Sequence, residues 1–187
     1  MGCSSNGRQA DKNTETYIHP GSQIPFPHTI GGFVRTDVVE NQPDHPGTKV
    51  GYYFEKSKWD VSIDVFVYPA PKNEPLEDDA KQDNDEQKPN DLLERMNIIQ
   101  QEMLEAGTDE EHRFIAKYDI VIAKGDNPYP GKRSYFRHQD EMFSNSYLFK
   151  YGDWFVEYRS VFDRNLEWHE DQFVKDHPWM ADEPSNG

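Results

Sequence analysis

The chain has 187 residues, of which 34% are hydrophobic and 13% aromatic, and it carries a formal net charge of −15. This length suits one folded domain with polar tails, because a single core of that size buries enough surface to be stable. The acidic balance argues against nonspecific binding to nucleic acid or to an anionic membrane, since both need clustered lysine and arginine. The single cysteine, Cys3, excludes an internal disulfide and a cysteine-based zinc site, and no motif predicts a cofactor.

Residues 1–23 are rich in Ser, Asn, Gly, Gln and Thr, which predicts a flexible tether before the folded domain. Within it, Gly2-Cys3-Ser4-Ser5 is similar to the processing junction of bacterial lipoproteins, which implies a lipid on Cys3 and attachment to a membrane. The signal peptide and the Leu-type residue of that junction are missing, so Met1 must stand in their place. Two alternatives are an incidental cysteine and a eukaryotic myristate on Gly2 with palmitate on Cys3, although Asn6 stands where that motif has Ser or Thr.

A single globular domain is expected from residue 24 to residue 178. Its first half predicts three strands, at residues 33–40, 48–55 and 60–68. In the third, valine and isoleucine alternate with polar or aromatic residues, as in a strand with one buried face. Trp59 lies at the turn before it and is a candidate partner contact, with a turn residue folded back on the sheet as the alternative.

An acidic segment and a helix follow. Residues 72–89 hold seven acids and predict a solvated, mobile loop, with weak calcium binding as an alternative that the segment's lack of EF-hand spacing disfavours. Residues 91–106 predict an amphipathic helix, capped by Asn90 and ended by Gly107. Its apolar stripe is expected on a sheet face and comprises Leu92, Met96, Ile99 and Met103, widened by Leu93, Ile98 and Leu104.

The next strands are predicted at residues 114–124 and 132–139, joined by a rigid turn over 125–131. Basic side chains gather around this turn in an otherwise acidic chain. If the strands pair, these side chains are expected at one end of the sheet, as a candidate site for an anion or an acidic partner. The alternative is that they only break up an acidic surface. The candidates are Lys124, Lys132, Arg133, Arg137 and His138.

The most regular strand pattern is a hairpin of residues 147–150 and 154–162, with Gly152 at its turn. One face of the second strand is assigned to the core. The other, with Glu157 and Arg159, is open either to function or to a cross-strand ion pair of little value. A short helix is predicted from Asp163 to about Lys175, followed by a tail at 179–187.

Together these elements predict an α+β fold. About six to seven strands form a mostly antiparallel sheet, with one long helix packed on it and a short C-terminal helix. The long helix is expected on one face and the N-terminal segment or the C-terminal helix on the other. The sequence contains no phosphate-binding loop, no nucleophile elbow and no metalloprotease helix, and His169 and His177 are poorly spaced for one metal.

Some stretches resemble a known group of proteins. The order IPFPHTIGGFVR, GTKVGYYFEKSKWDVSIDVFVYPAP and SYLFKYGDWFVEYRSVF is similar to uncharacterised bacterial exported proteins and lipoproteins over residues 24–162. More weakly, the arrangement resembles PsbP/Mog1-like domains, in which helices pack on an antiparallel sheet. Both resemblances rest on turn glycines and strand aromatics, so they imply a fold and no catalytic residues.

These observations favour a non-catalytic, lipid-anchored domain of the bacterial cell envelope, facing the periplasm or the exterior. Its partners would be the membrane, through Cys3, and an unknown envelope protein or small ligand, with no nucleic acid. One alternative is a hydrolase-type enzyme whose site forms only in the fold. Another is an acidic immunity or inhibitor protein that binds a basic partner.

Overall fold

The computed structural model describes residues 14–41, 47–54, 61–71, 91–106, 113–124, 127–137, 142–163 and 167–180. It confirms the predicted α+β class, with a long helix and a short C-terminal helix on a mostly antiparallel sheet. Cys3, Trp59, His138 and the acidic segment 72–89 lie outside the described residues. Within the described ranges, no helix is long and apolar enough to cross a membrane.

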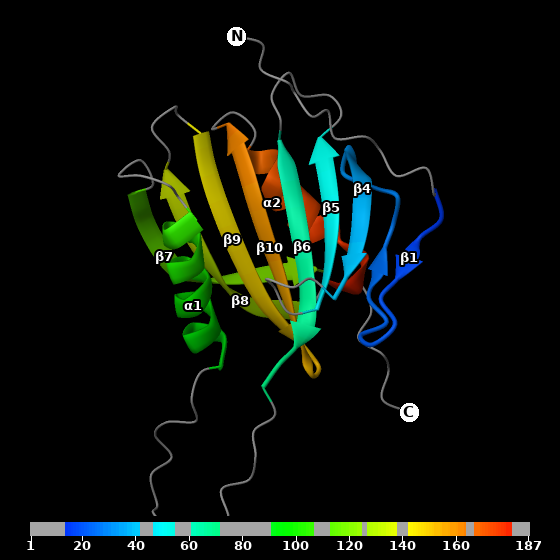
Figure 1. Ribbon diagram of the computed structural model, residues 1–187, viewed down its shortest axis with the longest axis horizontal. Coiled ribbons are helices and arrows are strands. Elements are labelled where there is room, and N and C mark those ends of the chain that lie inside the picture. The colour runs from blue at the N-terminus through cyan, green and yellow to red at the C-terminus, as the bar shows by residue number, and fades with distance from the viewer. Residues whose placement is uncertain are drawn as a thin grey trace, which may run out of the picture.

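Eight strands form the main sheet, in the order β3-β4-β5-β6-β10-β9-β8-β7, and two short strands, β1 and β2, pair beside it (Figure 1). The strands are β1 Tyr17–Ile18, β2 Pro25–Phe26, β3 Thr29–Ile30, β4 Phe33–Glu40, β5 Thr48–Phe54, β6 Ser62–Pro69, β7 Arg113–Lys124, β8 Asn127–Arg137, β9 Met142–Tyr151 and β10 Trp154–Asp163. The helices are α1 Asp91–Ala106, α2 Glu167–Asp176 and the 3-10 turn η2 Pro178–Met180.

The two halves of the chain meet at the centre of the sheet, where β6 pairs antiparallel with β10. In this register Tyr158 lies opposite Val65 and Ser160 opposite Ile63. The alternation predicted for both strands is confirmed, because Val65, Ile63 and Tyr158 are fully buried on one face. The β9–β10 hairpin closes through Gly152, whose φ of 55° is the left-handed conformation expected at that turn.

Helix α1 covers one face of the sheet, over β8 and β9 (Figure 1). Met96 and Ile99 are fully buried against Leu148 and Phe155, with Leu92 and Met103 packed at the edge, as the helical period predicted. Two residues assigned to the stripe are not in it: Leu93 is 39% exposed and Ile98 46%. At about 100° per residue, Ile98 lies on the side of α1 opposite Met96, and Leu93 lies on the flank of the stripe away from Arg95, so both reach solvent.

The opposite face holds the larger core, covered by α2, η2 and the N-terminal strands. Arg35 is buried there and ties the N-terminal segment to the sheet through the carbonyl oxygens of Phe26 (2.7 Å) and Glu15 (2.9 Å). The tether boundary at residue 23 is therefore wrong, since β1 already pairs with β2 at residues 17–18. The tail boundary at residue 179 is wrong too, because Trp179 is a buried core residue.

Two strand boundaries differ from the predictions. Strand β8 begins at Asn127, so most of the predicted turn 125–131 is strand. Its prolines are tolerated because the register between β8 and β9 begins only at Gly131, and Pro128 and Pro130 face a strand on one side alone. Strand β9 begins at Met142 rather than residue 147, since its polar residues Ser144, Asn145 and Ser146 are buried between the two helical layers.

Candidate functional site

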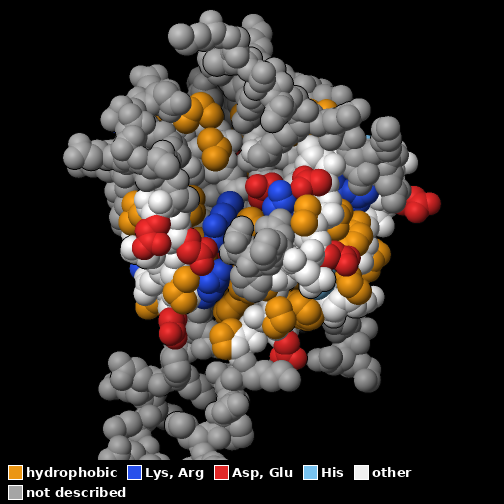
Figure 2. All heavy atoms as spheres, viewed as in Figure 1, with side chains coloured by type: hydrophobic (Ala, Val, Ile, Leu, Met, Phe, Trp, Pro, Cys, Tyr) orange, Lys and Arg blue, Asp and Glu red, His pale blue; other side chains and the backbone are white. Residues whose placement is uncertain are grey.

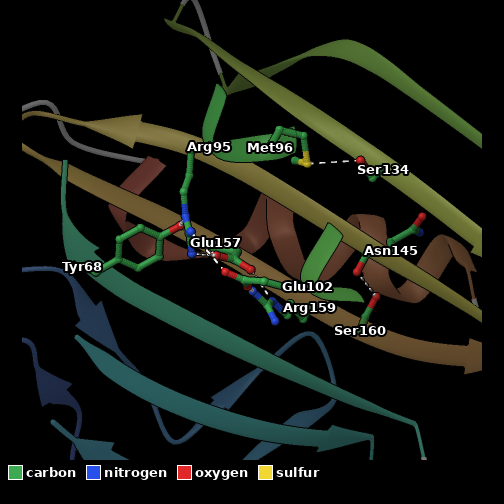
Figure 3. Close-up of polar contacts among 9 residues, drawn as sticks. All are labelled: Tyr68, Arg95, Met96, Glu102, Ser134, Asn145, Glu157, Arg159 and Ser160. Carbon is green, nitrogen blue, oxygen red and sulfur yellow. Dashed lines mark hydrogen bonds and ion pairs between the residues drawn. The ribbon is translucent and has the colours of Figure 1, made fainter. Parts of the chain in front are cut away.

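The most concentrated group of charged side chains lies between α1 and the sheet. Glu157 of β10 has no exposed surface, although a carboxylate is rarely buried without partners. Arg159, two residues further along the same strand, donates a hydrogen bond to it, and Arg95 of α1 approaches it to 3.7 Å. Glu157 is therefore held between two guanidinium groups, one from the sheet and one from the helix (Figure 3).

Two further residues complete this cluster. Arg95 Nε donates to the hydroxyl of Tyr68 (2.8 Å), which in turn donates to Glu157 Oε2 (2.8 Å). Glu102 of α1 accepts from Arg95 Nη1 at 3.3 Å and from Arg159 Nη2 at 2.5 Å. We call this set of Tyr68, Arg95, Glu102, Glu157 and Arg159 the α1 clamp. It contains two positive and two negative charges, so it neutralises itself.

The carboxylates and hydrogen bonds of the α1 clamp keep its two arginines protonated. Burial by itself lowers the pKa of Arg95 and Arg159, but hydrogen bonds and the charges of Glu157 and Glu102 outweigh it, and both pKa values stand above the ordinary value. Burial, and then the charge of Glu157, raises the pKa of the Tyr68 hydroxyl. The tyrosine therefore stays a hydrogen-bond donor. These properties suit a structural clamp rather than proton transfer near neutral pH.

Aromatic rings support the two arginines. The Arg95 guanidinium lies 4.9 Å from the centre of the Tyr68 ring, and that of Arg159 lies 5.2 Å from the Phe66 ring. Figure 2 shows acidic and basic side chains next to each other across the middle of this face of the molecule. Nearby on the same face, Lys49 pairs with Asp37 at 3.1 Å and with Asp64 at 3.9 Å. The charged residues named here therefore pair with one another.

A second buried carboxylate lies on the opposite side of the sheet. Glu170 of α2 accepts hydrogen bonds from the Asn145 amide (2.7 Å) and from the Ser160 hydroxyl. Burial raises the pKa of Glu170 to about 8, although the hydrogen bonds and the charge of Arg133 lower it. The group is therefore largely protonated at neutral pH. It joins α2 to β9 and β10 from inside the core.

The C-terminal residues are fixed by a third polar contact. Trp179 Nε1 donates to the hydroxyl of Tyr158 (2.7 Å), and that hydroxyl lies 3.1 Å from His177 Nδ1. His169 packs against the ring of Phe54, with 4.5 Å between ring centres. Neither histidine is placed for a metal, and the described part of the chain contains no group of three His, Cys, Asp or Glu that could hold one.

The basic residues predicted around the 125–131 turn do not form one cluster. Lys124 and Arg137 lie at opposite ends of the β7–β8 hairpin, because Lys124 pairs with Asn127 and Arg137 with Arg113. Lys132 and Arg133 are consecutive and point to opposite faces of the sheet. Lys132 pairs with Asp119, and Arg133 lies 3.7 Å from Asp171 of α2. The long β8 strand, which replaces the predicted turn, is the reason for this separation.

The α1 clamp was only half visible in the sequence. Glu157 and Arg159 were singled out, but their face is not open, since Glu157 is buried under α1. Their ion pair exists within one strand and is not cross-strand. Charged residues at alternate positions of an otherwise apolar strand were the available signal, whereas the helix partners Arg95 and Glu102 gave none.

The sequence matches no protein-family model and no curated protein. The fold, in contrast, is similar to the solution structure of cyanobacterial PsbP (CyanoP) from Synechocystis sp. PCC 6803. The TM-score is 0.53 at 10% identity, and the match covers 94% of this chain and 96% of that one. The likeness confirms the predicted PsbP-like fold and concerns the fold alone. The resemblance to bacterial exported proteins has no family match and stays a prediction.

Proposed function

We propose that this chain is a non-catalytic binding domain of the bacterial cell envelope, held at a membrane by a lipid on Cys3. The observation that carries the proposal is the use of its two buried carboxylates. Glu157 is neutralised by two arginines and Glu170 is hydrogen-bonded inside the core, so each joins a helix to the sheet. The PsbP-like fold, matched over nearly the whole chain, supports a scaffold whose surface binds a protein or a small ligand.

The anchor would come from the N-terminal segment. Gly2-Cys3-Ser4-Ser5 supplies the small residues and the cysteine that lipid attachment uses, and the folded domain begins by Tyr17. Fourteen residues, 4–17, separate Cys3 from Ile18. They reach at most about 50 Å when fully extended, so the domain would stay close to the bilayer. One acyl chain gives weak binding, and a stable anchor needs a second signal or a second chain.

The test uses the protein produced from its own gene, with its natural start. Mass spectrometry of the N-terminal peptide is expected to show a lipid-sized mass increase on Cys3, and the protein is expected in the membrane fraction. The variant Cys3→Ser should move to the soluble fraction, while Ser4→Ala, the matched control, should not. An unmodified Cys3, or equal fractionation of Cys3→Ser and the control, would contradict the anchor.

A further inference from the structure

The β7 strand forms one edge of the main sheet. It is the last strand in the sheet order and pairs with β8 alone among the strands that the structure describes. Figure 1 shows it at the side of the molecule that lies away from β1. With 12 residues it is far longer than β3, the two-residue strand at the other edge. A long edge offers a row of backbone donors and acceptors to which another extended segment can add.

The β7–β8 hairpin at this edge is basic, whereas the chain as a whole is acidic. Strands β7 and β8 together carry six basic residues and one acidic residue, in a protein whose net charge is −15. The basic residues are Arg113, Lys117, Lys124, Lys132, Arg133 and Arg137, and the acidic one is Asp119. Lys132 and Arg133 pair with Asp119 and Asp171, and the excess of positive charge remains on the hairpin. Such an edge attracts an acidic segment and repels a basic one.

The edge also presents apolar surface. Val121 is 64% exposed, more than any other large hydrophobic side chain of the described residues. It lies on the same side of the strand as Lys117 and Asp119, which are also exposed. The only register shift between β7 and β8 falls between Phe114 and Ala116, so the strand is regular from Ala116 to Lys124. Nine regular residues are enough to pair with an extended segment.

We propose that the β7 edge binds an extended acidic segment of a partner protein, which adds to the sheet as a further strand. Backbone hydrogen bonds would supply affinity. On the face that carries Lys117 and Val121, an acidic side chain of the segment would lie near Lys117, and an apolar side chain four residues away would cover Val121. This inference rests on the proposed binding function and names its partner class. A second copy of this chain is disfavoured as the partner, because pairing of the two β7 edges would bring two basic hairpins together, and the remainder of each chain is acidic.

The probes are three synthetic peptides of 12 residues. The first is a threonine-rich strand with glutamate and valine four residues apart, so that both lie on one face. The second has lysine in place of the glutamate. The third is the first with two central threonines replaced by proline, which cannot complete a strand. They are titrated into the full chain labelled with ¹⁵N. The acidic strand peptide should bind, with amide shifts concentrated on β7, and more weakly as salt is raised. The basic and the proline peptides should not bind measurably.

Two matched variants locate the site. Val121→Asp places a negative charge on the edge and should weaken binding of the acidic peptide by at least about tenfold, a difference of 1.4 kcal/mol. Ile98→Asp makes the same change at an exposed apolar residue of α1 and should leave binding unchanged. Equal effects of the two variants, shifts centred away from β7, or equal binding of the basic peptide would overturn the proposal.

Two further measurements exclude other occupants. Sedimentation of the chain alone should show a monomer, and a dimer that Val121→Asp abolishes would assign the edge to a second copy instead. Changing the seven acids of residues 74–86 to their amides should leave peptide affinity unchanged. A gain in affinity would assign the edge to the chain's own acidic segment. Cys3→Ser should bind the peptide normally, so loss of the anchor and failure of this inference are distinguishable.

Discussion

Replacing the titratable carboxyl of Glu170 should change how stability depends on pH. Burial raises the pKa of this carboxyl to about 8 from an ordinary value of 4.5. Between these values the folded chain keeps the proton and the unfolded chain loses it, so the free energy of unfolding falls as pH rises, by about 1.4 kcal/mol per pH unit. From pH 5.5 to 7.5 one such group costs about 2–3 kcal/mol. Glu170→Gln keeps a neutral amide among Asn145 and Ser160 and removes this loss.

The assay is urea unfolding at pH 5.5, 6.5 and 7.5, followed by tryptophan fluorescence. The advantage of Glu170→Gln over the wild type should grow with pH by the amount given above. The charged and titratable groups near Glu170, namely Arg133, Asp171 and Tyr147, are present in both proteins, so their titration largely cancels in the difference. Glu105→Gln, at an exposed position of α1, is the control and should follow the wild type. A difference that stays constant over this range would refute the argument.

Three other substitutions test the packing, each by urea unfolding at constant pH. Glu157→Gln leaves two arginines of the α1 clamp without their buried anion and should cost about 3–5 kcal/mol, whereas a loss below 1 kcal/mol would mean that water or relaxation replaces the carboxylate. Trp179→Ala should cost about 3–5 kcal/mol because it leaves a cavity in the core and removes a hydrogen bond to Tyr158. An unchanged urea midpoint would mean that Trp179 is not packed in the core. Gly131→Ala should cost about 1–3 kcal/mol, since a Cβ there would lie 2.6 Å from the Phe149 ring. Gly152→Ala meets no neighbour and should cost only the roughly 1–2 kcal/mol of its left-handed φ.

The sequence predicted the fold where local patterns and tertiary packing agree. Helix α1 was placed at its observed bounds, residues 91–106, because its cap, its period and its closing glycine all point to the same element. Strands β6 and β10 were recognised for the same reason. Strand β9 was truncated because its first half, Phe143–Ser146, is mostly polar. Those residues form a strand because β8 and β10 pair with them on either side. A short stretch of sequence does not show which strands will lie beside it.

The candidate site was harder to predict than the fold. The α1 clamp joins residues 68, 95, 102, 157 and 159, which meet only after α1 has packed over β8 and β9, beside β10 and β6. Nothing in the sequence marks Glu170 as buried, yet it faces Asn145 and Ser160 in the core. The basic residues near the turn were seen correctly as a local excess of charge. Their predicted grouping at one end of the sheet failed because strand length, not composition, decides where each of them lies.

The positions of the proposed anchor and the proposed docking edge are consistent with each other. The N-terminal strand β1 lies at one side of the sheet and β7 at the other (Figure 1). Six strands of the main sheet separate β7 from β3. A lipid on Cys3 would attach the chain from its β1 side, and a tether that reaches up to about 50 Å would leave the basic edge free to meet an acidic segment. The same separation predicts that the acidic peptide binds equally well to the chain in solution and to the chain anchored on neutral phosphatidylcholine vesicles, and a loss on vesicles would place the β7 edge against the membrane.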